Sequence, residues 1–164
     1  MIRASLAGGR EVMDVYSGHF DVDMKEDNTP LTEADRRSHA VIEEMLDGAR
    51  VADASAPTLS EEGAQIEYSK RAGWRRYFLI DPLDGTKEFV KRNGEFTINV
   101  ALMVQGESQV QPGPESAARA QPAATQPVAT EPTDTQPAGT QPYAQPTAGV
   151  VYAPYLKVLY IGVV

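Results

Sequence analysis

The chain has 164 residues, a formal net charge of −8 at pH 7, two histidines and no cysteine. The length predicts one domain, and the excess of acidic residues argues against a surface that wraps nucleic acid. The lack of cysteine excludes thiolate catalysis, disulfides and Cys-based zinc sites, and His19 and His39 are too few for a His-rich metal site.

The sequence also has no membrane-spanning or secretory pattern. No apolar run approaches the roughly 20 residues that a transmembrane helix needs. The N-terminal residues are too poor in apolar side chains for a signal peptide. We therefore expect a cytoplasmic protein.

Two helices are predicted in the N-terminal part of the chain. The first spans residues 2–17 and the second spans Thr32–Leu46, each with apolar residues at helical spacing. Thr32 is placed as the N-cap of the second helix and Asp35 as its N3 partner in a capping box. Taken alone, Asp35 is therefore interpreted as a helix-capping residue. Lys25, in the polar connection between the helices, is interpreted as a solvated side chain.

The stretch Phe78–Thr86 is the most informative in the chain. It begins as an apolar, β-favouring run, which predicts a buried strand. The strand is expected to stop at Asp81, because Pro82 fixes φ and has no backbone donor. Asp84 follows three residues after Asp81, so two carboxylates on a rigid turn can converge on one cation.

The same stretch contains a glycine that can turn the backbone sharply. Gly85 can adopt a backbone conformation closed to other residues. A short helix is predicted over Thr86–Lys91, so the amides of Gly85 and Thr86 would lie at a helix N-terminus. A phosphate oxygen is favoured at such a position.

Ordinary turn chemistry explains the same residues without a ligand. Asp-Pro and Asp-Gly are common turn dipeptides. Likewise, Glu61 and Glu62 follow a predicted short strand, Thr58–Ser60, and two adjacent acids are typical of a solvated turn. From the residues alone, both the turn and the metal-site interpretations stay open.

Further strands are predicted after the short helix. Asn93-Gly94 is typical of a hairpin turn, and residues 96–103 alternate between apolar and other side chains, as in a strand. Residues 149–162 return to strand character and are expected to form a hairpin around Ala153-Pro154.

Residues 107–147 differ in composition from the rest of the chain. They hold eight of the twelve prolines, and a Thr-Gln/Glu-Pro unit recurs every five residues from Thr125 to Pro142. Few side chains there are large enough to bury, so burial cannot offset the entropy of ordering. We expect a disordered low-complexity insert between two paired strands, although a proline-rich ligand for a binding module is an alternative.

The sequence resembles a known family at these motifs. Asp81-Pro-Leu-Asp-Gly-Thr86 resembles the metal-binding signature of the inositol monophosphatase superfamily, the lithium-sensitive, Mg²⁺-dependent phosphatases. The longer run Asp81–Leu102 resembles the CysQ branch, the 3'(2'),5'-bisphosphate nucleotidases. The Thr-x-x-Asp at Thr32, the acids after Ser60 and the run Gly149–Pro154 resemble the corresponding elements of the family.

The resemblance implies an α+β fold: the N-terminal half of the layered α/β sandwich of the inositol monophosphatases, with two helices packed on an antiparallel sheet. The metal-site domain would consist of residues 1–106 and 148–164, and residues 107–147 would be the insert. The resemblance places no counterpart of the family's C-terminal subdomain, with its last metal-ligating aspartate, in this sequence. We expect the sheet then to expose an apolar edge or face, which favours self-association.

The resemblance also implies which residues do the chemistry. Hard oxygen ligands select two or three Mg²⁺ ions, with Mn²⁺ as an alternative. Glu61 and Thr86 would orient the attacking water, and Asp35 would face the metal cluster. The implied metal ligands are Glu61, Asp81, the carbonyl of Leu83 and Asp84, and the implied substrate-binding residues are Gly85, Thr86 and Lys87. Lys87, Lys91 and Arg92 are candidates for a second phosphate, or are solvated. The resemblance would also place Lys25 near the active site.

The implied activity is hydrolysis of a phosphomonoester. The substrate would be a small phosphorylated nucleotide, adenosine 3',5'-bisphosphate, which would give AMP and clear a by-product of sulfate activation. Two alternatives remain open: an inositol-phosphate phosphatase, and a non-catalytic remnant that binds Mg²⁺ and phosphate weakly.

Overall fold

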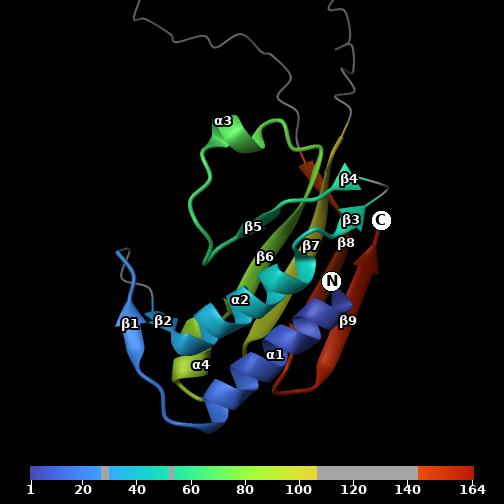
Figure 1. Cartoon of the computed structure of the whole chain (residues 1–164). Coiled ribbons are helices and arrows are strands. Elements are labelled where there is room, and N and C mark those ends of the chain that lie inside the picture. The colour runs from blue at the N-terminus through green and yellow to red at the C-terminus, as the bar shows by residue number, and fades with distance from the viewer. Residues whose placement is uncertain (27–29, 52–53, 107–143) are drawn as a thin grey trace, which may run out of the picture.

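A computed structural model describes residues 1–26, 30–51, 54–106 and 144–164. Helices α1 (Ile2–Ser17) and α2 (Glu33–Leu46) pack against each other and lie on one face of a five-stranded sheet (Figure 1). This arrangement confirms the predicted α+β fold with two helices packed on a sheet. None of the helices in the described ranges is long and apolar enough to cross a membrane.

The main sheet has the strand order β5-β6-β7-β8-β9. The strands are β5 (Thr58–Ser60), β6 (Arg76–Asp84), β7 (Thr97–Gln105), β8 (Ala144–Ala153) and β9 (Val158–Val163). Strands β6 to β9 pair antiparallel, but β5 pairs parallel with β6. The sheet is therefore antiparallel from β6 to β9, as expected, with one parallel pair at β5. A parallel pair needs a crossover connection, and residues 61–75, with the short helix α3 (Tyr68–Arg71), provide it.

Small elements surround this sheet. Strands β1 (Val22–Met24) and β2 (Pro30–Thr32) form one antiparallel pair, and β3 (Arg50–Val51) and β4 (Ala54–Ser55) form another. Helix α4 (Thr86–Val90) follows β6, where a short helix is predicted.

The core lies between the two long helices and the sheet. Along β7, Ile98 and Val100 are almost fully buried, whereas Asn99 between them faces away from the helices. This confirms the predicted period-2 strand. Phe89 of α4 is fully buried and packs against Tyr16 and Phe96, with ring centroids 5.1 and 5.2 Å away. Helix α4 is thus anchored by an aromatic contact to α1.

Two predicted strand ends differ from the structure. Strand β6 does not stop at Asp81 but continues to Asp84, with a shift of register between these residues. Strand β8 begins at Ala144, so residues 144–147 belong to the sheet and not to the insert. They pair with the end of β7, and this pairing outweighs their low-complexity composition. The rest of the predicted insert, residues 107–143, lies outside the described residues.

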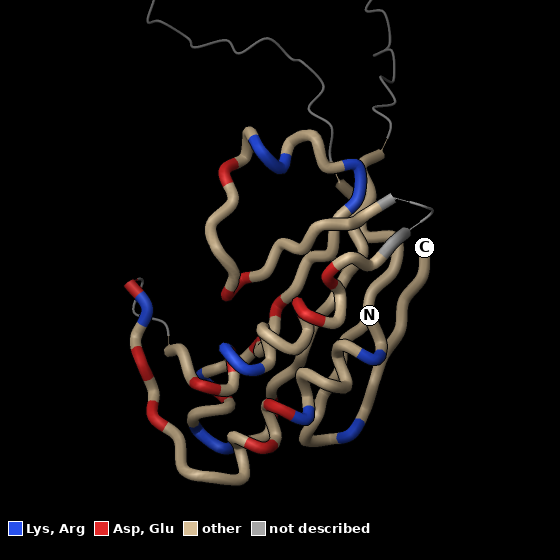
Figure 2. Tube along the Cα trace, viewed as in Figure 1, with Lys and Arg blue, Asp and Glu red and all other residues tan. Residues whose placement is uncertain are grey.

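The sheet face opposite the helices carries exposed apolar side chains. Leu79, Val151 and Tyr160 lie on this face and are 40%, 40% and 64% exposed. The edge strand β9 has no charged residue along its length, and Figure 2 shows no red or blue along this strand. This face is the surface for which the sequence predicts self-association.

Candidate metal centre

A cavity of about 220 Å³ lies where β6 ends and α4 begins. It contains every predicted site residue except Asp35. Its lining residues are Lys25, Pro30, Glu61, Asp81, Leu83, Asp84, Gly85, Thr86, Lys87 and Glu88. The cavity therefore brings together side chains from the β1–β2 segment, the end of β5, β6 and α4.

A β-bulge shapes the floor of this cavity. Asp81 pairs with Asn99 and Asp84 pairs with Thr97, so β6 has one more residue than β7 between the two pairs. Pro82, in the bulge, has no N–H to donate to the ladder. Both aspartates consequently line the cavity, and the backbone N–H of Leu83 donates to Asp81 Oδ1 at 3.3 Å.

Gly85 turns the chain from β6 into α4. Its φ is +91°, and a Cβ at this position would lie 2.9 Å from the carbonyl oxygen of Glu95. Only glycine combines this left-handed backbone with this close approach. Thr86 follows as the first residue of α4, and its Oγ1 lies 3.2 Å from the carbonyl oxygen of Leu83.

Asp35 is buried behind Thr86. Its Oδ2 accepts from the backbone N–H of Thr32 at 2.7 Å and from Thr32 Oγ1 at 2.6 Å, and the Thr32 side chain accepts from the N–H of Ala34. The predicted capping box is therefore confirmed. The other oxygen, Oδ1, lies 3.1 Å from Thr86 Oγ1, which links the cap of α2 to the edge of the cavity.

Lys25 forms ion pairs at the cavity, so it lies where the resemblance places it and is not the solvated side chain that the residues alone suggest. Its Nζ lies 3.3 Å from Glu61 Oε1 and 2.5 Å from Glu62 Oε1. Although burial acts in the opposite direction, these carboxylates raise the pKa of Lys25 above its ordinary value. The side chain of Glu61 is 55% exposed and that of Glu62 only 11%, so Glu61 is the more accessible of the two acids.

Asp81 is the most perturbed acid of the cavity. Burial, together with the neighbouring charges of Glu61 and Asp84, raises its pKa to about 7. A half-buried carboxylate among like charges is costly, and a cation at this position would remove the cost.

The donor set fits a hard divalent cation. Glu61, Asp81, Asp84 and the carbonyl of Leu83 offer only oxygen, which Mg²⁺ and Mn²⁺ prefer. In the present arrangement, no group of three acidic or histidine side chains within the described ranges is close enough to hold an ion. Two of these acids contact donors of the chain: Lys25 Nζ lies 3.3 Å from Glu61 Oε1, and Asn99 Nδ2 donates to Asp84 Oδ2 at 3.0 Å.

The basic residues after Gly85 differ in their surroundings. Lys87 is exposed and lines the cavity, and Lys91 is exposed with its Nζ 3.4 Å from Glu88 Oε1. Arg92 instead donates to the carbonyl oxygens of Tyr16 and Gly18 and lies over the Phe20 ring. Arg92 therefore has a structural role.

The sequence analysis did not single out Ser38, which supports the bulge from behind. Its Oγ is buried and donates to the carbonyl oxygen of Pro82 at 2.7 Å. The available signal was its position, three residues after Asp35 on the same face of a predicted helix, as a polar residue among apolar ones.

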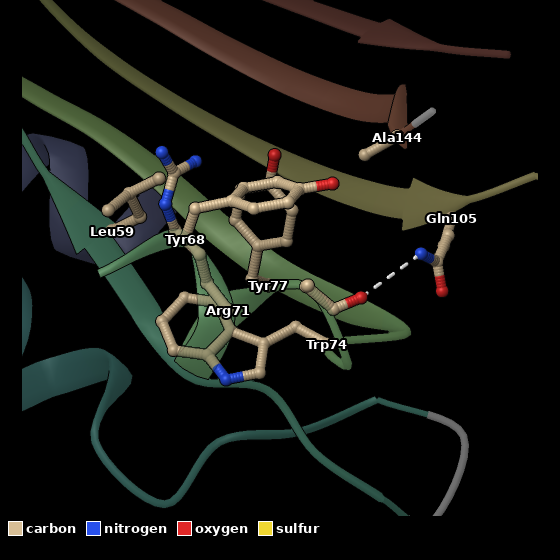
Figure 3. A pocket seen from close by; sticks show the side chains of 8 residues that line it. Leu59, Tyr68, Arg71, Trp74, Tyr77, Gln105 and Ala144 are labelled. Carbon is tan, nitrogen blue, oxygen red and sulfur yellow. Dashed lines mark hydrogen bonds between the residues drawn. The ribbon is translucent and has the colours of Figure 1, made fainter. Parts of the chain in front are cut away.

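A second cavity, of about 140 Å³, lies near the start of β6 (Figure 3). Trp74 and Tyr77 meet there with ring centroids 5.8 Å apart, and the Arg71 guanidinium lies 5.4 Å from the centroid of the Tyr68 ring. Gln105 Nε2 donates to the carbonyl oxygen of Ala72. None of the described residues that line this cavity is a carboxylate, so their chemistry differs from that of the acidic cavity.

A comparison with family models matches residues 2–111 to the inositol monophosphatase family. The match covers most of the chain and includes all the residues that line the acidic cavity. The chain belongs to the inositol monophosphatase family. This confirms the resemblance on which the site was predicted.

Individual relatives narrow the similarity to one branch. The chain is 38% identical to the 3'(2'),5'-bisphosphate nucleotidase CysQ of Salmonella typhimurium over 93% of its own length and 46% of that protein. It is 50% identical to CysQ of Escherichia coli K12 over 60% of its own length and 39% of that protein. The crystal structure of CysQ from Bacteroides thetaiotaomicron superposes with a TM-score of 0.62 at 34% identity, over 99% of this chain and 44% of that one. The chain thus spans about half the length of these relatives.

Proposed function

We propose that this chain is the metal-binding part of a Mg²⁺-dependent phosphomonoesterase of the 3'(2'),5'-bisphosphate nucleotidase type. Its reaction would remove the 3'-phosphate of adenosine 3',5'-bisphosphate to give AMP. The observation that carries the proposal is the acidic cavity, in which Glu61, Asp81 and Asp84 lie beside Gly85 and Thr86. The similarity to CysQ proteins supports this choice of substrate.

The metal would be held by the carboxylates of Glu61, Asp81 and Asp84 and by the carbonyl of Leu83. When bound, Mg²⁺ or Mn²⁺ supplies an acidified water and stabilises the charge on the leaving oxygen. The raised pKa of Asp81 means that this residue gives up a proton when it becomes a ligand near neutral pH.

The remaining cavity residues would orient water and phosphate. Thr86 has one hydroxyl proton and two acceptors within reach, Asp35 Oδ1 and the Leu83 carbonyl, so it donates to one of them and can accept from a water. Glu61, exposed on the opposite wall, would take up that water's proton. The amides of Gly85 and Thr86 and the Lys87 ammonium would bind the phosphate.

The division of the chain is also part of the proposal. The metal-site domain would consist of residues 1–106 and 144–164, and residues 107–143 would be an insert between β7 and β8. The cytoplasmic location remains a prediction. Self-association through the exposed sheet face also remains one, and light scattering on the purified chain tests it: a monomer at micromolar concentration would contradict it.

Phosphate release from adenosine 3',5'-bisphosphate by the purified chain tests the activity, with Mg²⁺ present and with Mg²⁺ plus Li⁺. We expect release that Asp81→Asn and Li⁺ abolish. Glu44→Gln is the matched control, because Glu44 is an exposed acid of α2 outside the cavity. Faster release from inositol monophosphate would select the alternative phosphatase. No release from either substrate, with Mg²⁺ still raising the melting temperature, would select the non-catalytic binding remnant.

A further inference from the structure

One turn of α2 contacts three segments that line the acidic cavity. Asp35 lies beside Thr86, the first residue of α4. Ser38 donates to the carbonyl oxygen of Pro82, inside the bulge between Asp81 and Asp84. His39, the next residue, reaches β5, where its Nδ1 lies 2.9 Å from Ser60 Oγ.

The contact of His39 is one of two side-chain contacts between α2 and β5. Glu43, one helical turn further on, accepts from Thr58 Oγ1 at 2.9 Å. Residues four apart on a helix and residues two apart on a strand are both spaced by roughly 6 Å and lie on one face, so the two pairs match in register. These two contacts therefore fix both the distance and the direction of β5 relative to α2.

Glu43 also lies beside the second ring nitrogen of His39. Its Oε2 lies 3.4 Å from His39 Nε2. In the tautomer that carries its hydrogen on Nε2, Nδ1 is free to accept from the Ser60 hydroxyl. Both ring nitrogens thus face a polar partner.

Ser60 lies directly before Glu61 at the end of β5. Successive side chains of a strand point to opposite faces, so a Ser60 side chain held against α2 directs Glu61 to the face on which Asp81 lies. The backbone agrees with this, because the N–H of Glu61 donates to the carbonyl oxygen of Ile80 at 3.0 Å. The side chain of Glu61 itself is 55% exposed, and its only hydrogen bond or ion pair with a described residue is the one with Lys25.

We infer that His39 is a positioning residue of the metal site: through Ser60 it aims the exposed Glu61 carboxylate at the cavity. The inference rests on the proposed function, because it assumes that Glu61 is a metal ligand. A residue that orients a ligand in this way contributes about 10- to 100-fold to metal affinity.

Two substitutions separate the two nitrogens of His39. In His39→Asn the side-chain amide takes the place of Nδ1 and can still accept from Ser60, whereas in His39→Gln it takes the place of Nε2 and faces Glu43 only. We expect His39→Gln to raise the dissociation constant for Mg²⁺ at least about 10-fold, and His39→Asn to change it much less. Titration of the purified full-length chain with Mg²⁺, by calorimetry or by the shift in melting temperature, measures both.

A merely structural role would give the opposite order. Asn is a poorer helix former than Gln, so helix stability alone would make His39→Asn the more damaging change. Ser60→Ala should match His39→Gln in Mg²⁺ affinity, and the double variant should be no worse than either single one. Equal Mg²⁺ affinity in the Gln and Asn variants, or additive losses in the double variant, would overturn the inference.

Glu61→Gln distinguishes a failure of this inference from a failure of the proposed function. If the wild-type chain binds Mg²⁺ and Glu61→Gln does not, Glu61 is a ligand and the His39 variants decide the positioning role. If Glu61→Gln binds Mg²⁺ as the wild type does, or if neither binds it, the metal-site proposal fails together with the role of His39.

Discussion

Asp35 Oδ1 lies 3.1 Å from Thr86 Oγ1, although the two residues are 51 positions apart in the sequence. The contact joins the N-terminus of α2 to that of α4, and the same carboxylate closes the capping box with Thr32. One buried acid therefore stabilises a helix and holds a residue of the cavity wall.

Asp35→Ala should lower the free energy of unfolding by about 1–3 kcal/mol, because it removes the capping acceptor and leaves the buried N–H of Thr32 unpaired. Asp35→Asn should cost less. Its amide oxygen can still accept from Thr32, and the Thr86 hydroxyl can donate to the Leu83 carbonyl instead. Urea unfolding of both variants without metal checks the order. Equal losses would mean that the negative charge, and not the acceptor, is what stabilises α2.

Ser38→Ala should destabilise the chain by about 1–3 kcal/mol, because the buried carbonyl oxygen of Pro82 loses its donor. Ser5→Ala is a matched control. Ser5 is equally buried, yet its Oγ has no hydrogen-bond partner among the described residues, so its removal should be neutral or stabilising. Thermal unfolding of the two variants measures the contrast, and similar losses at both serines would refute this account of the bulge.

Gly85→Ala should be strongly destabilising, because alanine at this position combines a φ of +91° with a contact of 2.9 Å to the carbonyl oxygen of Glu95. Two other glycines separate these causes. Gly48→Ala introduces only the backbone strain, since φ is +66° and no atom lies within 4 Å, and should cost about 1 kcal/mol. Gly149→Ala meets neither obstacle and should be tolerated. The loss in unfolding free energy should increase from Gly149→Ala to Gly48→Ala to Gly85→Ala. Any other order contradicts the prediction.

Asp81 should make stability depend on pH. Its pKa in the folded chain is about 7, above the ordinary value of 3.8, so the folded state binds its proton more tightly than the unfolded state does. The contribution of this group to stability is therefore fully present below about pH 4 and is lost as the pH rises to about 7. Asp81→Asn should remove this dependence. At pH 8 and without metal, the variant should be more stable than the wild type.

Melting temperatures of the wild type and Asp81→Asn between about pH 5 and pH 8, in a metal-free buffer, check this prediction. Asp47→Asn is the control, since Asp47 is an exposed acid at the end of α2 and outside the cavity. The difference between wild type and Asp81→Asn should change with pH, and a change of the same size in Asp47→Asn would contradict the assignment to Asp81. A pH-independent difference at Asp81 would mean that its carboxyl is ionised throughout this range.

The sequence by itself determined the local chemistry of the chain. Helical spacing and the Thr32–Asp35 pair predicted α2 and its cap, alternation predicted β7, and the Asp-Pro-Leu-Asp-Gly-Thr motif marked the end of β6 and the start of α4. These features depend on neighbours within a few residues, so one-dimensional patterns are sufficient to find them.

Only the tertiary structure decided how distant segments meet. Several features join residues separated by 20 positions or more: the parallel pairing of β5, the ion pairs of Lys25, the contacts of Ser38 and His39 and the backbone role of Arg92. No local pattern encodes them, because they result from packing α2 on the sheet and α4 against α1. The sequence named the acids of the site, and the fold decided which other residues hold them in place.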